Sequence, residues 1–154
     1  MTDFEIRPAL PEDAEALSSL LEQIDLLSYD VLAPGTRYWL ALDKAGALAG
    51  CIGMEFGPQA VLLRSVAVRP EARKQGLGRT LVTFALDFAR QAGYRRAYLF
   101  SVRSGGYWQR MGFRTVPVDE LTGALPTAPQ VLRFQQIGKL ARETGWRLDL
   151  DPAQ

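Results

Sequence analysis

The sequence predicts an α/β protein with a mixed central sheet of about six to seven strands, flanked by helices. An apolar, β-branched run at 62–68 is typical of a strand that is covered on both faces. Apolar residues then recur at spacings of three and four from Leu77 to Ala92, the period of an amphipathic helix. A second strand-like run follows at 96–101. Because a strand, a helix and a strand in this order form a right-handed crossover, we expect the two strands to be parallel neighbours.

The pattern of the first 35 residues predicts one strand and one helix. Residues 4–7 alternate like a short strand, and apolar residues on one face predict a helix over 14–24, after a proline and two acids suited to a first turn. Residues 25–35 are ambiguous, since their apolar residues would also fit a short second helix that ends before Pro34-Gly35.

The middle of the chain predicts an antiparallel pair of strands. The runs 37–42 and 47–55 are strand-like, and Asp43-Lys44-Ala45-Gly46 between them has the composition of a hairpin turn. Gly50 and Gly53 interrupt the second run, which indicates a bulge or a close approach of another group to the backbone.

The last third predicts smaller elements. Gly93 is expected to end the long helix, and a short helix is expected over 107–111. Residues 113–118 read as a strand, residues 119–136 as loop and helix, and residues 147–150 as a closing strand.

Length and composition predict a single domain over 1–154 with small partners. The chain has 154 residues, of which 47% are hydrophobic, enough for one real core. It has 18 basic and 17 acidic side chains, a net charge of +1, so it lacks the broad positive surface of a nucleic-acid-binding protein.

Cysteine and histidine usage narrows the chemistry. One cysteine, Cys51, forms no internal disulfide, and with no signal peptide and no membrane span in the sequence we expect a cytoplasmic protein with no membrane partner. With no histidine and one cysteine, no metal site is expected. Acid–base chemistry is left to Glu, Asp, Tyr, Lys or water.

The segment between the apolar strand and the long helix has the features of a phosphate site. It reads Arg73-Lys74-Gln75-Gly76-Leu77-Gly78-Arg79, and it places glycines and cations where a helix exposes its first amides and the positive end of its dipole. A plain surface turn is the alternative reading. The residues after Gly78 do not fit a nucleoside-triphosphate P-loop or a dinucleotide fingerprint.

The pattern Arg73-x-x-Gly76-x-Gly78, after an apolar strand and opening a helix, resembles motif A of the GNAT family of N-acetyltransferases. The phrase Ile6-Arg7-Pro8-Ala9 with Asp13 resembles the opening of that family. The phrase from Tyr107 to Phe113 resembles its motif B, with one departure. Trp108 stands where the family often has a tyrosine, and the tyrosine is one residue earlier.

The resemblance implies a GNAT-type fold, with a bulged central strand that splays from its parallel neighbour, and acetyl-CoA as co-substrate. The loop amides and cations would hold the pyrophosphate, and the backbone around Val66 and Val68 would bind the pantetheine and the acetyl carbonyl. The cofactor-binding residues expected are Val66, Ala67, Val68, Arg73, Lys74, Gln75, Gly76, Leu77, Gly78, Arg79, Ser101, Ser104 and Tyr107.

Two residues are candidates for catalysis. Glu55, at a strand end, would take the amine's proton through a water, or it would instead be a solvated strand end or the ion-pair partner of Arg64. Arg64 interrupts an apolar strand, so it needs a partner, either Glu55 or a substrate carboxylate. Tyr107 would protonate the leaving thiolate, with Ser101 or a water behind it, or it would be a core aromatic beside Trp108.

The resemblance therefore predicts an N-acetyltransferase that moves the acetyl group of acetyl-CoA to a primary amine of a small molecule by direct attack in a ternary complex. Short segments look like the branch that holds amino-acid N-acetyltransferase domains and arsenic-resistance acetyltransferases, so an amino acid or an analogue is the expected acceptor. The alternatives are a non-catalytic acyl-CoA-binding module and a nucleotide-binding or nucleic-acid-associated domain, which the incomplete fingerprints and the near-neutral charge disfavour. Acetyltransferases of this kind often form homodimers.

Overall fold

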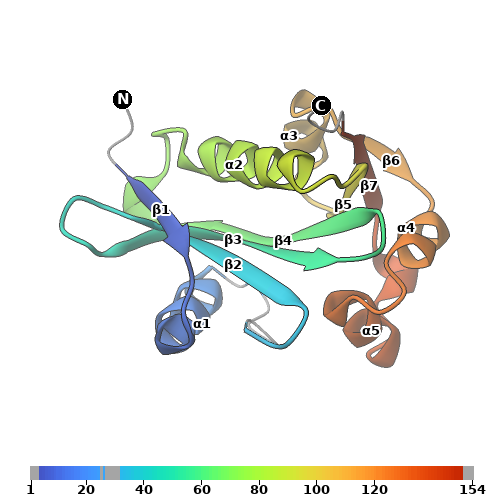
Figure 1. Cartoon of the computed structure of the whole chain (residues 1–154), viewed down its shortest axis with the longest axis horizontal. Helices are drawn as coiled ribbons and strands as arrows, with labels where there is room; N and C mark the ends of the chain where they lie inside the picture. The colour runs from blue at the N-terminus through green and yellow to red at the C-terminus, as the bar shows by residue number, and fades with distance from the viewer. Residues whose placement is uncertain (1–3, 25, 27–31, 151–154) are drawn as a thin grey trace. The chain divides into compact units, whose positions relative to one another are not determined.

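The computed structural model describes residues 4–24, 26 and 32–150 (Figure 1). Its strands are β1 (Glu5–Pro8), β2 (Thr36–Leu42), β3 (Leu48–Phe56), β4 (Ala60–Val68), β5 (Arg96–Phe100), β6 (Arg114–Val116) and β7 (Gly145–Asp149). Its α-helices are α1 (Ala14–Gln23), α2 (Leu77–Gln91), α3 (Gly105–Arg110), α4 (Val118–Ala124) and α5 (Pro129–Gln136). Short 3-10 turns occur at Pro11–Asp13, Pro70–Ala72 and Leu140–Arg142.

The hydrogen-bonding order of the strands is β1-β2-β3-β4-β5-β7-β6. β4 and β5 form the parallel pair, in which Ala60–Leu62 face Arg96–Tyr98. The predicted fold class, a mixed sheet flanked by helices with one parallel pair, is therefore confirmed.

The described residues fall into two compact units, which we treat separately. The first takes its residues from 1–54 and 65–85, and the second from 55–64 and 86–154. Strands β3 and β4 and helix α2 contribute to both units. The prediction of a single domain over 1–154 is not tested by this division and stays a prediction.

In the first unit, α1 and the start of α2 cover opposite faces of the strands (Figure 1). The α1 face has one hydrophobic cluster, in which three helix leucines pack on alternate strand residues: Leu17, Leu20, Leu21, Tyr38, Leu40, Cys51 and Ala67. Trp39, next to Tyr38 on β2, points to the other face, where its ring lies 5.8 Å from that of Phe84 on α2. The alternation follows from the two-residue period of a strand.

Both glycines of β3 lie where another group approaches the backbone closely, as predicted. A Cβ on Gly50 would lie 2.7 Å from the carbonyl oxygen of Ala67 and 3.2 Å from a methyl group of Leu77 at the start of α2. A Cβ on Gly53 would lie 2.6 Å from the ring of Tyr38. The lack of a side chain at these positions lets α2 pack on β3 and lets Tyr38 lie across it.

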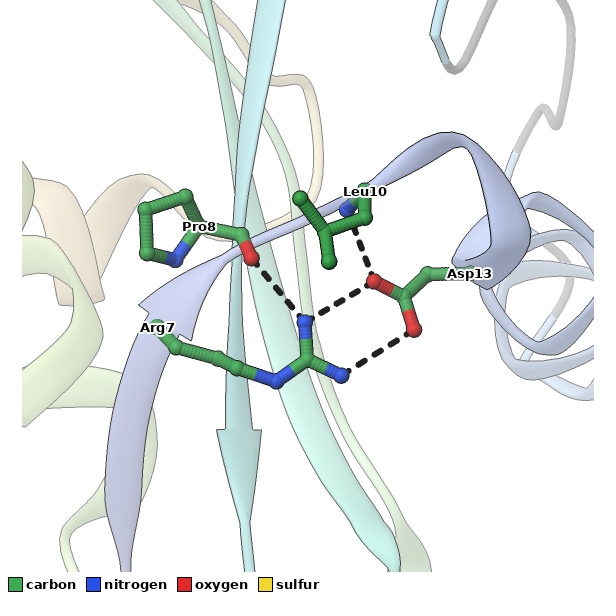
Figure 2. A network of polar contacts seen from close by, with 4 residues as sticks. All are labelled: Arg7, Pro8, Leu10 and Asp13. Carbon is green, nitrogen blue, oxygen red and sulfur yellow. Dashed lines mark hydrogen bonds and ion pairs between the residues drawn. The ribbon is translucent and has the colours of Figure 1, made fainter.

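The link from β1 to α1 is held by one polar network (Figure 2). The two terminal nitrogens of Arg7 donate to the two carboxylate oxygens of Asp13 at 2.9 and 3.1 Å. The amide of Leu10 donates to Asp13 at 2.7 Å, and Arg7 also donates to the carbonyl of Pro8 at 3.0 Å. The Arg7 guanidinium, and then the Leu10 amide, hold the pKa of Asp13 below its ordinary value. This network gives a structural role to the opening phrase of the sequence.

In the second unit, β7 pairs antiparallel with β5 and β6. Helices α4 and α5 bury one face of these strands through a cluster of seven residues: Ala60, Leu62, Tyr98, Leu121, Leu125, Ala128 and Val131. The hydroxyl of the fully buried Tyr98 donates to Glu120 of α4 at 2.8 Å, and Arg147 of β7 donates to the same oxygen at 2.8 Å.

The structure corrects several predicted boundaries in this unit. The helix expected over 107–111 is Gly105–Arg110, and the closing strand expected over 147–150 is Gly145–Asp149. The strand expected over 113–118 is shorter, because Pro117 lacks an amide donor and Val118 already begins α4. The loop and helix expected over 119–136 are two helices, and Pro129 opens the second at a first-turn position. The ambiguous helix around 25–35 lies mostly outside the described residues. No helix in the described part of the chain is long and apolar enough to span a membrane.

Candidate functional site

The segment from β4 to α2 has the backbone conformation of an anion-binding loop. β4 ends at Val68, a 3-10 turn follows at Pro70–Ala72, and α2 begins at Leu77. Lys74 has a φ of 68° and Gly76 a φ of 76°, both left-handed. Left-handed residues within a turn aim successive amide groups into one concave nest. The side chains of residues 73–76 are exposed, so this nest is open to a ligand.

The amides of this loop are available to a ligand. Thr80 donates to the carbonyl of Gly76 at 3.0 Å, which is the first bond of the helix. Among the residues that the structure describes, none accepts a hydrogen bond from the amides of residues 74–79. The helix that follows has 15 residues, and its dipole places partial positive charge at the same end. The loop and helix together can bind a phosphate group.

Three cations belong to the same segment as these amides. The side chains of Arg73, Lys74 and Arg79 are exposed. Arg73 donates through Nε to the carbonyl of Val68 at 3.3 Å, which fixes its side chain beside the end of β4. The backbone conformation, the amides and the charges thus favour the phosphate-site reading over that of a plain surface turn.

β4 is irregular at the residue before Val66. Ser65 has a φ of 56°, which costs an L-residue about 1–2 kcal/mol. The burial pattern also changes here, since residues 60–64 are all buried, whereas Ser65, Val66 and Val68 are half-buried. A left-handed residue inside a strand is the mark of a bulge, which redirects the following backbone groups. The bulge expected in the central strand therefore lies at Ser65.

Glu55 and Arg64 lie together in the second unit and form an ion pair. Arg64 Nη1 is 2.7 Å from Glu55 Oε2, and the two side chains are 4% and 0% exposed. Of the roles considered for Glu55, the solvated strand end is excluded by this burial. The ion-pair alternative is present in the structure, and the catalytic role remains a prediction.

The second oxygen of Glu55 also has a partner. The amide of Gln130 donates to Oε1 at 2.8 Å. Gln130 is the second residue of α5, so the carboxylate caps the first turn of that helix and faces the positive end of its dipole. Each carboxylate oxygen therefore already accepts a hydrogen bond. A water that passes a proton to Glu55 would bind an oxygen that also accepts from Arg64 or from the Gln130 amide.

Ser101, Ser104 and Tyr107 lie around the start of α3, also in the second unit. The amide of Ser104 donates to the hydroxyl of Ser101 at 3.3 Å, and Trp146 donates to the carbonyl of Ser101 at 2.8 Å. Tyr107 is half-buried and its ring packs edge-on against Trp108, with 4.9 Å between centroids. Trp108 is buried and also contacts Phe113, so it is a core residue.

The structure adds residues that the sequence reasoning did not select. Asp43, in the β2–β3 turn, accepts from the amides of Ala45 and Ala47 at 2.9 Å each and from Arg69 at 3.2 Å. The Ala47 amide is the largest cause of a lowered pKa of Asp43. The ion pair between Asp43 and Arg69 ties the hairpin to the segment that leads from β4 to α2. It lies beside an open cavity of about 420 Å³ that Gln75 also lines. Only the turn composition at 43–46 pointed to Asp43.

Tyr38 is a further residue near the bulge that the sequence pattern does not identify. Its hydroxyl donates to the hydroxyl of Ser65 at 2.9 Å, which joins β2 to the bulge in β4. Gly53 was the available signal, because it marked a close approach without identifying the side chain that makes it.

Comparison with known proteins gives three concordant results. The model of the acetyltransferase (GNAT) family matches residues 4–113. An amino-acid acetyltransferase of Neisseria meningitidis is 30% identical over 116 residues, which are 73% of this chain and 27% of that protein.

Among solved structures, N-acetylglutamate synthase of Neisseria gonorrhoeae, in complex with coenzyme A and N-acetyl-glutamate, aligns with a TM-score of 0.79 at 22% identity. The alignment covers 98% of this chain and 36% of that one. A GNAT N-acetyltransferase of Escherichia coli in complex with CoA aligns with a TM-score of 0.64 at 25% identity, over 74% of this chain and 70% of that one. This chain thus spans only about a quarter to a third of the length of the two Neisseria proteins.

Proposed function

We propose that this chain, which belongs to the acetyltransferase (GNAT) family, transfers the acetyl group of acetyl-CoA to the primary amine of a small molecule. The proposed acceptor is an amino acid or an analogue. The observation that carries the proposal is the loop from Arg73 to Arg79, with six amides that donate to no described acceptor, two left-handed residues and three exposed cations. The acceptor class is supported by the relative named amino-acid acetyltransferase.

The loop has a defined part in this reaction. The amides of residues 75–79 donate to the pyrophosphate of the co-substrate, and Arg73, Lys74 and Arg79 balance its charge. Gly76 takes the left-handed conformation that the loop requires, and no heavy atom lies within 4 Å of the position of a Cβ there. The residues present therefore fit a diphosphate.

The bulge in β4 supplies the second part. Acetyl-CoA brings the acetyl group as a thioester, and the amide of Val66 donates to its carbonyl oxygen as negative charge develops there. A donor that is fixed before the reaction lowers the barrier because nothing has to reorganise, and removal of one such donor costs about 2.7–4 kcal/mol in other enzymes. The backbone of Val68, together with Ala67, binds the pantetheine.

The second unit supplies the proposed proton acceptor, the acceptor-binding cation and the proton donor. Glu55 accepts the proton of the amine through a water, and Arg64 holds Glu55 or a carboxylate of the acceptor. Tyr107 donates a proton to the leaving thiolate, with Ser101 and Ser104 shaping the loop before it. The compartment proposed is the cytoplasm, which fits a cysteine, Cys51, that forms no disulfide within the described residues.

The test is a thermal-unfolding series with acetyl-CoA, CoA and NAD, followed by acetyl transfer to a panel of amino acids. A ligand at 100 times its dissociation constant stabilises the folded state by about 2.7 kcal/mol. For a chain of this size we expect the midpoint to rise by about 5–10 °C with either CoA species and to stay unchanged with NAD. No shift with CoA would refute the loop assignment. Binding without acetylation of any amine in the panel would refute the acceptor class.

A further inference from the structure

Ser65 is held in a conformation that a serine rarely adopts. Its φ of 56° lies in the left-handed region, and it sits inside the nine-residue strand β4 rather than in a turn. Among the described residues, one other non-glycine residue shares this region, Lys74, and it lies in an exposed loop. A strained backbone persists where its surroundings over-determine it. The contacts of Ser65 therefore identify what maintains the bulge.

Two side chains from two other strands bind the two oxygens of Ser65. Tyr38 on β2 donates its hydroxyl proton to Oγ at 2.9 Å. Cys51 on β3 donates its thiol proton to the carbonyl oxygen at 3.4 Å. An O–H···O bond at this distance is well formed, whereas a thiol is a weak donor, so Tyr38 provides the stronger constraint.

Tyr38 is itself rigid because of where it lies. β3 lies between β2 and β4 in the sheet, and the ring of Tyr38 occupies the space above Gly53 of β3, where a Cβ would come within 2.6 Å of it. The side chain is 1% exposed and belongs to the hydrophobic cluster under α1. The tyrosine thus crosses β3 at its glycine and carries a fixed hydroxyl to the bulge.

We infer that Tyr38 is a positioning residue: through its hydrogen bond to Ser65, it holds the bulge so that the amide of Val66 points at the acetyl carbonyl. The inference rests on the proposed function. The amide of Val66 follows directly after Ser65, so its direction depends on the backbone angles of Ser65. Tyr38, on β2, would in this way affect the rate of acetyl transfer through the direction of the Val66 amide.

The test is kinetic and uses Tyr38→Phe, which keeps the ring over Gly53 and removes only the hydroxyl. We expect kcat to fall about tenfold while the KM for acetyl-CoA changes less than about twofold, because the phosphate loop is untouched. Tyr98→Phe is the matched control. Tyr98 is also fully buried, and its hydroxyl donates a hydrogen bond to Glu120. Loss of the Tyr98 hydroxyl should leave kcat unchanged.

A glycine at position 65 separates positioning from general weakening of the fold. Glycine adopts the left-handed conformation without a clamp, so Tyr38→Phe should have less than about a twofold effect on kcat when it is made in Ser65→Gly. An active wild type whose kcat is unaffected by Tyr38→Phe would overturn this inference alone. An equal loss in both backgrounds would also overturn it. A wild type that binds CoA but acetylates no amine would overturn the proposed function and this inference with it.

Discussion

Glu55→Gln separates the two roles that remain for the buried carboxylate. The substitution keeps the size of the side chain and a carbonyl oxygen that can accept from the Gln130 amide, and it removes the charge that pairs with Arg64. Because the Arg64 side chain is only 4% exposed, its guanidinium would remain in a nearly dry site beside a neutral partner.

The expected loss of stability follows from that geometry. Removing one partner of a buried ion pair costs about 3–5 kcal/mol, and the retained bond to Gln130 places this case near 3 kcal/mol. At about 2–4 °C per kcal/mol for a chain of this size, the unfolding midpoint should fall by about 6–12 °C. The double variant Glu55→Gln/Arg64→Met removes the buried guanidinium as well as the carboxylate, so it should be more stable than Glu55→Gln alone.

The assay measures stability and rate on the same samples. Urea unfolding gives the free energy, and the pH profile of kcat/KM is recorded at a temperature where each variant is folded. A base role predicts that kcat/KM of Glu55→Gln falls and that the acid limb of the profile is lost, in the single and the double variant alike. A change in stability below about 1 kcal/mol would refute the ion-pair reasoning. An unchanged pH profile would leave Glu55 with its structural role alone.

The remaining predictions concern the loop and the β1–α1 link. Gly76→Ala should weaken CoA binding, because alanine disfavours the left-handed φ of that loop position. Gly93 is also left-handed with open space around it, so Gly93→Ala should lose only stability, about 1–2 kcal/mol. Calorimetric titration with CoA distinguishes the two variants. Lys74→Gly relieves a left-handed lysine, so stability should hold within about 1 kcal/mol while the salt dependence of CoA binding becomes shallower. The lowered pKa of Asp13 stabilises the fold above the unfolded value of about 3.9, and this stability is lost as pH falls through the lower folded pKa. The difference in stability between wild type and Asp13→Asn should therefore be constant above about pH 5 and shrink below pH 4 in pH-dependent urea unfolding.

The sequence predicted the fold well where local pattern and tertiary packing agree. The loop over residues 73–79 is a local feature, since its two glycines, three cations and the helix start are adjacent in the chain. Gly50 and Gly53 predicted close approaches because a glycine in a strand has few other uses. The paired Arg7 and Asp13 lie only six positions apart, and both belong to the opening phrase that resembles the family.

The parts that escaped prediction depend on contacts between distant positions. Tyr38 and Ser65 are 27 residues apart, and their hydrogen bond depends on the register of three strands, which no local pattern reveals. The partner of Glu55 on α5 was not expected, because the capping group comes from a strand and not from the residue before the helix. The end of β6 was placed two residues too late, since Val118 suits a strand and the helix-starting role of Pro117 was not recognised.

The bond between Glu55 and Gln130 joins positions 75 residues apart and so bears on the order in which the chain folds. Until α5 docks, the carboxylate at the end of β3 lacks one of the donors that it has in the folded protein. An intermediate with paired strands and a free α5 is thereby penalised. We expect docking of α5 and burial of the end of β3 to form one cooperative step, so that amide hydrogens in the two segments exchange through a single shared opening.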